Sequence, residues 1–219
     1  MSDGRLAAML ADAARGCFPP PDGSVTILPQ PAERDAGVIA FTAHSAIFTS
    51  ADPDWVRAQL PPGDLAGPME PAFLHALAER TGRTAHATDL LTVAAPLPGP
   101  PRMDLVPLGS RPGAAVHARV ARALRYRDDV RVWQADGGLL LLGRGVAGRH
   151  EVAVEVDAAR QRAGLGRALA MAARHLLSDS AALWAQITPG NAASVRAFLA
   201  AGFVPVGAEA LLVDQDSPA

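Results

Sequence analysis

The chain has 219 residues, enough for one large domain or two small ones with a buried core. Its formal net charge of −2 and pI near 6.3 exclude a global attraction to nucleic acid or to anionic membranes. A single cysteine, Cys17, excludes an internal disulfide and fits a reducing cytoplasm. No apolar run approaches the ~20 residues of a membrane-spanning helix, and residues 1–16 lack the pattern of a signal peptide. We therefore expect a cytoplasmic protein with neither a nucleic-acid nor a membrane partner.

All basic residues other than histidine are arginine, and alanine, glycine and proline are abundant. This bias is typical of a GC-rich bacterial genome. The six histidines show no spacing that would ligate a metal ion. With one cysteine in addition, we predict no metal site.

Hydrophobic periodicity predicts a mixed α/β first half, residues 1–95. Asp52 directly precedes Pro53 and is expected to cap a helix that begins there. In chain order, the expected elements are a helix over 5–15, strands over 24–28 and 37–48, a helix from 52, a helix over 70–81 and a strand over 90–95.

The run Pro96-Leu-Pro-Gly-Pro-Pro101 is the clearest linker, and we place a domain boundary at 96–102. A second domain is expected over 103–213, with a polar tail over 214–219. The expected elements of this domain are a strand over 103–108, a helix over 114–124, strands over 130–134, 139–145 and 151–156, a helix over 164–177, a strand over 183–188, a helix over 192–201 and strands over 204–206 and 210–213.

Residues 151–177 have the pattern of a strand, a tight turn and a helix that begins with Gly164-Leu-Gly166. A helix start presents unpaired backbone N–H groups and the positive end of the helix dipole. Glycines there let a phosphate approach the backbone, because no Cβ stands in the way. Gln161, Arg162 and Arg167 add hydrogen-bond donors. The stretch therefore predicts a cradle for phosphate or pyrophosphate.

The spacing Gln161-Arg-Ala-Gly164-Leu-Gly166 is Q-x-x-G-x-G, and it lies between a predicted strand and a predicted helix. In that context it resembles the acyl-CoA pyrophosphate loop of the GNAT superfamily of N-acetyltransferases. Residues 191–203 resemble the second helix of that family, with an Asn start, an apolar face and a Gly-Phe ending. One short strand, 183–188, separates the two segments, as the family requires. The resemblance covers about 104–213, roughly half of the chain.

The resemblance implies an α/β (α+β) fold, in which a mixed, mostly antiparallel sheet is flanked by helices. One N-terminal helix of the family is missing or very short here. The α/β first half carries no motif that can be placed. Its element order allows a degenerate copy of the same fold, with residues 70–81 echoing the cofactor helix, although it has no Q-x-x-G-x-G. The alternative is an α/β cap that shapes the acceptor pocket.

The resemblance also implies that an acetyl group moves from acetyl-CoA to a primary amine of a small molecule or peptide, by direct attack in a ternary complex. In the family a backbone N–H near the end of the central strand polarises the thioester. The implied cofactor contacts are Val154, Val156, Gln161, Arg162, Ala163, Gly164, Leu165, Gly166, Arg167, Asn191 and Ser194. Asn191 and Ser194 also suit the capping of a helix.

Glu151 and Glu155 share one face of the predicted central strand, opposite three valines. Either glutamate could act as the base, directly or through water, and the alternative is a solvated or salt-bridged sheet face. Glu151 lies nearest to the position from which the family often draws its base, and His150 is an alternative one register away. Phe198 stands where many members of the family carry a tyrosine that protonates the departing thiolate.

That departure supports a rival interpretation, a CoA-binding sensor or structural module without turnover. The sequence leaves open the amine acceptor, the acyl-chain preference and whether the chain forms a homodimer. A second motif, Gly143-Arg-Gly145-Val-Ala-Gly148, fits G-x-G-x-x-G. The residues after it alternate as a strand, so we predict a hairpin turn or bulge there rather than a dinucleotide site.

Overall fold

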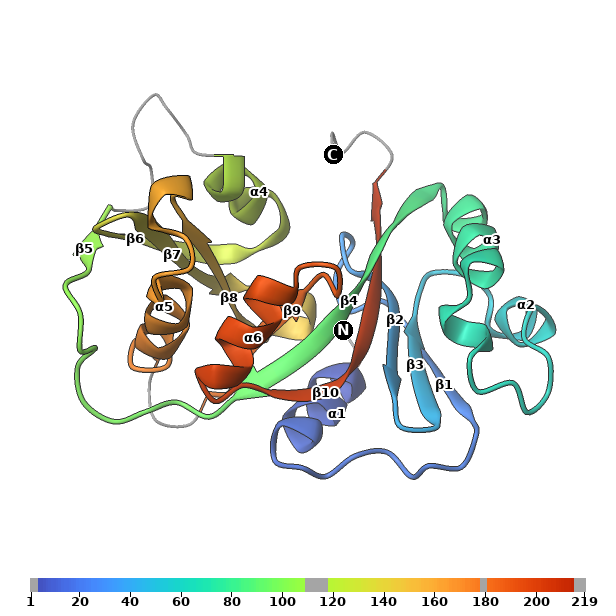
Figure 1. The fold of residues 1–219 in the computed structure, drawn as a ribbon. Helices are drawn as coiled ribbons and strands as arrows, with labels where there is room; N and C mark the ends of the chain where they lie inside the picture. Colours follow the sequence, from blue (N-terminus) through green and yellow to red (C-terminus); the bar gives the residue numbers. More distant parts are fainter. Residues whose placement is uncertain (1–3, 109–117, 178–180, 215–219) are drawn as a thin grey trace. The chain divides into compact units, whose positions relative to one another are not determined.

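The computed structural model describes residues 4–108, 118–177 and 181–214. The chain packs into two compact units, and Figure 1 shows their helices and strands. The first unit comprises Met1–Leu91 and Val206–Ala219, and the second comprises Thr92–Pro205. These units are defined by packing, and the domain boundary predicted at 96–102 stays a prediction.

The first unit is a sheet with helices packed against it. Its elements are α1 (Arg5–Ala14), β1 (Val25–Leu28), β2 (Ala36–Phe41), β3 (His44–Phe48), α2 (Pro53–Ala58), η1 (Gly67–Met69), α3 (Pro71–Thr81), most of β4 (Arg83–Ala94) and most of β10 (Val204–Asp214). The strand order is β1-β3-β2-β10-β4. β1 is parallel to β3, whereas β2 is antiparallel to both β3 and β10.

The second unit is built on the last residues of β4 and on the following strands. Its other elements are β5 (Val106–Pro107), α4 (Ala118–Tyr126), β6 (Asp128–Ala135), β7 (Gly138–Arg144), η2 (Val146–Gly148), β8 (His150–Val156), η3 (Ala158–Arg160), α5 (Leu165–Ala173), β9 (Leu183–Ile187) and α6 (Ala192–Ala200). The strand order is β4-β9-β8-β7-β6-β5. Neighbours from β5 to β8 are antiparallel, and β8 is parallel to β9. The predicted fold class, a mixed and mostly antiparallel sheet flanked by helices, is confirmed.

Two apolar layers in the second unit place its helices on opposite faces of the sheet (Figure 1). On one face, Leu169 of α5 and Phe198 of α6 belong to the same buried cluster as Val152 of β8. On the other face, Val120 of α4 belongs to a cluster against which Ala153 of β8 packs. The alternation of side chains along β8 therefore separates an α5/α6 face from an α4 face, as a strand requires.

One apolar cluster of the first unit lies between α2, α3 and the sheet, and α1 buries Leu6 and Leu10 as well. Val56, Phe73 and Leu77 are buried in one cluster with Val38 and Ile47. Phe73 and Leu77 have the helical spacing from which α3 was predicted. No helix among the described residues combines the length and apolarity needed to cross a bilayer.

Several predicted strands differ from the observed ones, and the strand expected over 103–108 is only Val106–Pro107. The single strand expected over 37–48 is wrong, because Thr42 and Ala43 form a turn between β2 and β3. Ala43 has φ 52°, a conformation that alanine rarely adopts. The sequence has no glycine at this turn from which it could have been predicted. The strand expected over 90–95 begins earlier, at Arg83. The pair expected over 204–206 and 210–213 is one continuous strand, β10.

Helix boundaries follow the predictions more closely. α3 ends at Thr81 and is capped by Gly82, whose left-handed backbone (φ 68°) lets the chain enter β4 at the next residue. α5 ends at Ala173 rather than near Leu177. The start of the helix predicted over 114–124 and most of the predicted tail lie outside the described residues.

The cap predicted at Asp52 is confirmed, because its Oδ1 accepts hydrogen bonds from the backbone N–H groups of Asp54 (3.0 Å) and Trp55 (2.9 Å). We expect Asp52→Ala to lower the free energy of unfolding by about 1 kcal/mol, since those two N–H groups lose their partner. Urea denaturation measures this change. Asp52→Asn keeps the acceptor oxygen and should stay close to wild type; equal losses in both variants would contradict the capping role.

Candidate functional site

The stretch predicted to be central forms β8, a loop and α5, in that order. The loop contains the short turn η3 and then Gln161–Gly164, all of which are exposed. Gly164 is the N-cap of α5 with φ 83°, and Arg162 also has a left-handed backbone, with φ 62°. Among the residues that the structure describes, no side chain caps α5, and the first turn of α5 contains no acidic residue. The first backbone N–H groups of α5 are therefore presented without competition from a carboxylate.

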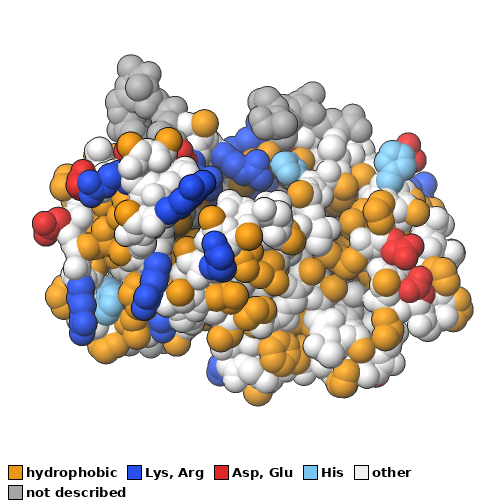
Figure 2. Space-filling view, viewed as in Figure 1, with side chains coloured by type: hydrophobic (Ala, Val, Ile, Leu, Met, Phe, Trp, Pro, Cys, Tyr) orange, Lys and Arg blue, Asp and Glu red, His pale blue; other side chains and the backbone are white. Residues whose placement is uncertain are grey.

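Two glycines keep this helix start open. A Cβ built on Gly164 would meet no atom within 4 Å. A Cβ on Gly166 would lie 3.7 Å from Val156 Cγ2 and 3.7 Å from Ala197 Cβ, so Gly166 brings α5 close to both β8 and α6. Arg162 and Arg167 are exposed beside this start, and Figure 2 shows basic side chains over the face that carries α5 and α6. The arrangement suits a phosphate group.

β8 and β9 pair only at their first residues. The parallel register joins His150 to Leu183 and Glu151 to Trp184, and no later register pair joins these two strands within the described residues. On its other side β8 pairs with β7 along its whole length, from His150 to Val156. The two parallel strands therefore separate after Glu151.

This separation leaves one edge of β8 available for hydrogen bonding. The N–H of Asp157 donates to Gly137 O (2.9 Å), on the β7 side. Backbone groups alternate between the two sides of a strand. Val156 and Val154 therefore direct their N–H groups away from β7, toward the side from which β9 has diverged. Both residues were predicted as ligand contacts, and the geometry presents their N–H groups next to the α5 loop.

The first turn of α6 has the predicted capping geometry. Asn191 is its N-cap, and the Asn191 side chain accepts a hydrogen bond from the Ser194 N–H (3.1 Å). Phe198 is 4% exposed, and its ring meets Phe203 edge to face with centroids 4.9 Å apart. Phe198 is therefore a core residue, and its position offers no proton donor.

Glu151 is 3% exposed, and two arginines lie beside its carboxylate. Its carboxylate accepts hydrogen bonds from Arg127 Nε (2.8 Å) and Arg149 Nε (2.8 Å). Gln186 Nε2 of β9 donates to it as well, at 3.3 Å. Burial raises the pKa of Glu151, but the charges and hydrogen bonds of Arg149 and Arg127 outweigh burial and hold that pKa below its usual value.

The close approach of Glu151 depends on a glycine in the turn before β8. A Cβ on Gly145 would lie 2.1 Å from Glu151 Oε1, so any larger residue here would displace the carboxylate from its present position. Gly145 belongs to the G-x-G-x-x-G run, and that run ends β7, forms the turn η2 and leads into β8. The predicted hairpin turn is thus confirmed, and Gly145 in that turn leaves room for the carboxylate of Glu151.

Glu155 lies on the same face of β8 but in a different environment. Its side chain is 32% exposed and forms an ion pair with Arg119 Nε of α4 at 2.8 Å. His150 is half-buried at the start of β8. Burial, followed by the charges of Arg144 and Arg131, lowers the pKa of His150, so its imidazole is neutral at pH 7. The structure therefore offers one buried carboxylate, one accessible carboxylate and one neutral imidazole along a single strand.

Sequence reasoning did not find the partners of these groups. Arg119 and Arg127 lie in or just after α4, Arg149 precedes β8, and Gln186 belongs to β9. Alternation within a strand predicts which face a side chain takes, but it does not predict which arginine from a distant element reaches that face. Among the described residues, no group of three His, Cys, Asp or Glu side chains is placed to hold a metal ion.

Comparisons with known proteins give little beyond this geometry. No protein-family model matches the chain, and no curated protein sequence matches it. Among solved structures, it is similar to a GCN5-related N-acetyltransferase from Kribbella flavida, with 14% identity over 98% of this chain and 96% of that chain. The TM-score is 0.42, and a likeness at this level carries no argument.

The Glu151 cluster leads to a prediction about stability. Glu151→Gln should lower the free energy of unfolding at pH 7 by about 3 kcal/mol, because the buried Arg149 and the largely buried Arg127 lose their counter-charge. The folded pKa of Glu151 is lowered, so its contribution is full above the ordinary value of 4.5 and is lost as the pH falls through the folded pKa. Chemical denaturation of both proteins should therefore show a gap that narrows under acid conditions.

Glu155→Gln is the matched control, since its ion pair is partly exposed and should contribute less than about 1 kcal/mol. A loss at Glu155 as large as that at Glu151, or a gap that widens in acid, would contradict the assignment.

Proposed function

We propose that the chain is an acyl-CoA-dependent N-acetyltransferase that moves an acetyl group from acetyl-CoA to a primary amine of a small molecule or peptide. The observation that carries the proposal is the parallel pair β8/β9, which separates after two residues beside an open, uncapped helix start. The separated edge and the helix start together offer backbone donors to an elongated ligand with an anionic end. An acyl-CoA has this form, with amides along one arm and phosphates at its end.

The residues present fit the anionic end of such a ligand. The open space at Gly164, the absence of acidic residues from the first turn of α5 and the exposed Arg162 and Arg167 all favour a pyrophosphate there. Gln161, Ala163, Leu165 and Gly166 complete the proposed loop. The amides of the ligand would then meet the backbone of Val154 and Val156, whose N–H groups face the open edge of β8.

Acetyl-CoA supplies the activated acyl group, and the protein supplies position and proton transfer. In this proposal the backbone N–H of Val156, at the end of β8, polarises the carbonyl oxygen of the thioester. Holding the amine and the acyl group together contributes to the rate by reducing the entropy lost on reaching the transition state. The acceptor ammonium must also lose a proton before it can attack.

Of the two predicted bases, Glu155 suits this task better. It is accessible on the open part of β8, and it lies on the face opposite the valines. Glu151 is buried, and two arginines stabilise its charged form, so accepting a proton would cost more at Glu151 than at a solvated carboxylate. We propose Glu155 as the base, directly or through water, with Glu151 holding the strands. The neutral imidazole of His150 is the second candidate.

The leaving thiolate needs less help than an alkoxide would. A thiol resembling free cysteine has a pKa of about 8.5, so its anion is a tolerable leaving group near neutral pH. The buried Phe198 is therefore compatible with turnover. Asn191, the N-cap of α6, and Ser194, whose N–H it accepts from, are the proposed contacts at the far side of the ligand.

Binding can be tested first, by thermal unfolding with and without acetyl-CoA. At one hundred times Kd, a specific ligand adds about 2.7 kcal/mol to the stability, which should appear as a clear rise in Tm. Gly164→Glu should abolish that rise, because it puts a negative charge at the mouth of the loop.

The control for this variant is Gly63→Glu. Gly63 also has a left-handed backbone, with φ 77°, and open space around it, but it lies in the first unit. An unchanged acetyl-CoA response in Gly164→Glu would exclude the loop as the phosphate site.

Turnover is tested by release of free CoA thiol in the presence of a panel of primary amines. We expect Glu155→Gln to lower kcat/KM about a hundredfold, within the range for removal of a general base, while Kd for acetyl-CoA stays unchanged. Absence of any amine-dependent thiol release, with binding intact, would instead favour a CoA-binding sensor or structural module.

A further inference from the structure

Helix α4 carries a row of arginines along one flank. At the 100° that separates successive helical residues, Arg119, Tyr126, Arg122 and Arg125 occupy neighbouring positions around the helix. Val120 and Ala123 form its buried side. We call Arg119, Arg122, Arg125 and Tyr126 the arginine strip.

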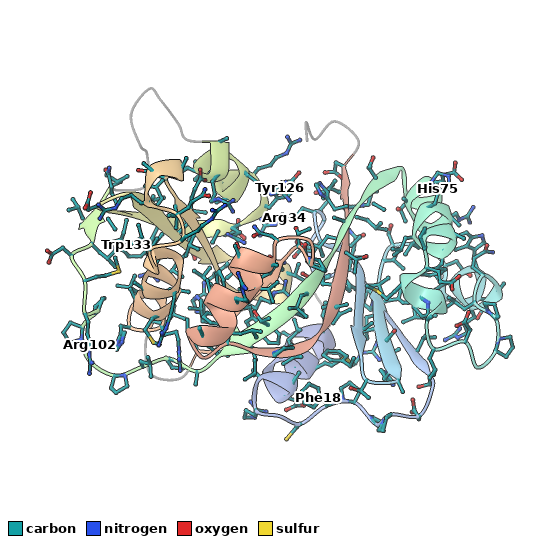
Figure 3. All side chains as sticks on the ribbon, in the orientation of Figure 1. Phe18, Arg34, His75, Arg102, Tyr126 and Trp133 are labelled. Atoms are coloured by element: carbon teal, nitrogen blue, oxygen red, sulfur yellow. The ribbon has the colours of Figure 1, made fainter. Side chains whose placement is uncertain are left out.

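Contacts between these side chains support their grouping. The guanidinium of Arg122 lies 5.4 Å from the centroid of the Tyr126 ring, and that of Arg125 lies 5.8 Å from it. Figure 3 labels Tyr126 at the end of α4. A ring held between two cations by cation–π attraction keeps both on one surface. Arg122 and Arg125 are exposed.

The strip begins at the proposed base. Arg119 Nε donates to Glu155 Oε2 at 2.8 Å, across the face of β8 that α4 covers. From Arg119 to Arg125 the helix rises about 9 Å. A cationic row thus leads away from the partly exposed carboxylate of Glu155. An acceptor bound here would place its ammonium at Glu155 and its remaining length along the arginines.

We propose that the acceptor is an acidic peptide, whose N-terminal amine lies at Glu155 and whose carboxylates lie along the arginine strip. This inference rests on the proposed acetyl transfer and names its substrate class. Arginine is suited to this role, because its planar fork binds carboxylates in pairs of hydrogen bonds. Nucleic acid fits less well, since the strip is short, carries one aromatic ring and ends at a carboxylate that would repel a phosphate backbone.

The test compares two synthetic peptides that share the start Ser-Gly. One continues with a run of aspartates, and the other continues with an equal run of asparagines. We expect kcat/KM to be about tenfold higher for the acidic peptide at about 0.05 M salt, because exposed ion pairs contribute a few-fold each. The preference should fall at about 0.5 M salt, as screening shortens the reach of surface charges.

In the variant Arg122→Gln/Arg125→Gln, kcat/KM for the acidic peptide should exceed that for the neutral peptide by about twofold or less. Arg119 is then the only arginine of the strip that can still pair with a carboxylate of the peptide. Arg57→Gln/Arg80→Gln removes two exposed arginines of the first unit and should leave the ratio unchanged. An equal rate for both peptides, or a preference that survives the strip variant, would overturn the proposal.

Direct binding separates this inference from the proposed activity. If no peptide is acetylated, fluorescence anisotropy of C-terminally labelled peptides still measures how tightly each peptide binds to the arginine strip. Binding of the acidic peptide that the strip variant loses would support the surface, while the absence of acetylation would count against the activity alone. No binding of the acidic peptide, or tighter binding of an oligonucleotide of equal charge at the strip, would overturn the peptide assignment.

Discussion

The carboxylate of Glu151 joins three parts of the second unit that are far apart in sequence. Arg127 follows α4, Arg149 precedes β8 and Gln186 belongs to β9, and all three donate to this one side chain. An isolated carboxylate at this depth would be strongly destabilised by loss of water. Two arginines and an amide offset that cost only while the three elements keep their places. Arg149 also lies over the ring of Trp184, with 5.5 Å between its guanidinium and the ring centroid. The cluster therefore fixes β9 against β8 at their first residues.

The position of this cluster determines where the site can open. The parallel strands β8 and β9 are paired at His150–Leu183 and Glu151–Trp184, and they separate after Glu151. The separation would be expensive inside a sheet, because unpaired backbone groups lose their partners. A ligand with amides along its length can supply those partners, and the helix start of α5 can bind an anionic end. The ion pairs of Glu151 therefore hold β8 and β9 together at the start of β8, and the edge of β8 is open at its other end.

Much of this arrangement could be predicted from the sequence. The alternation of Glu151 and Glu155 with valines gave the faces of β8, and Gly164-Leu-Gly166 gave the start of α5. Local patterns of this kind depend on neighbours in the chain, so they survive without a structure. The turn at Thr42 and Ala43 could not be predicted, because alanine seldom adopts a positive φ. The environment of Glu151 was equally hidden, since it depends on residues 24 positions before it and 35 after it.

The same reasoning explains why two glutamates that look alike in sequence have different chemistry. Both point from β8 toward α4, and each meets an arginine from that region. Glu151 meets a second arginine and an amide in a dry environment, so its charge is fixed. Glu155 pairs with Arg119 at a partly exposed position, which water can reach. A group that must gain and lose a proton needs the second environment, and a group that must hold strands together needs the first.

The chain contains arginine but no lysine, and this also has a structural consequence. Arg174 donates from Nε to Ala95 O (2.9 Å) and from Nη1 to Ala201 O (2.8 Å), and so joins two segments through one side chain. Arg149 combines a hydrogen bond from Nε with a ring contact through its planar face. A lysine ammonium is a point charge without a plane or a fork, and it could make neither pair of contacts in this geometry. The core of the second unit therefore depends on the shape of arginine as well as on its charge.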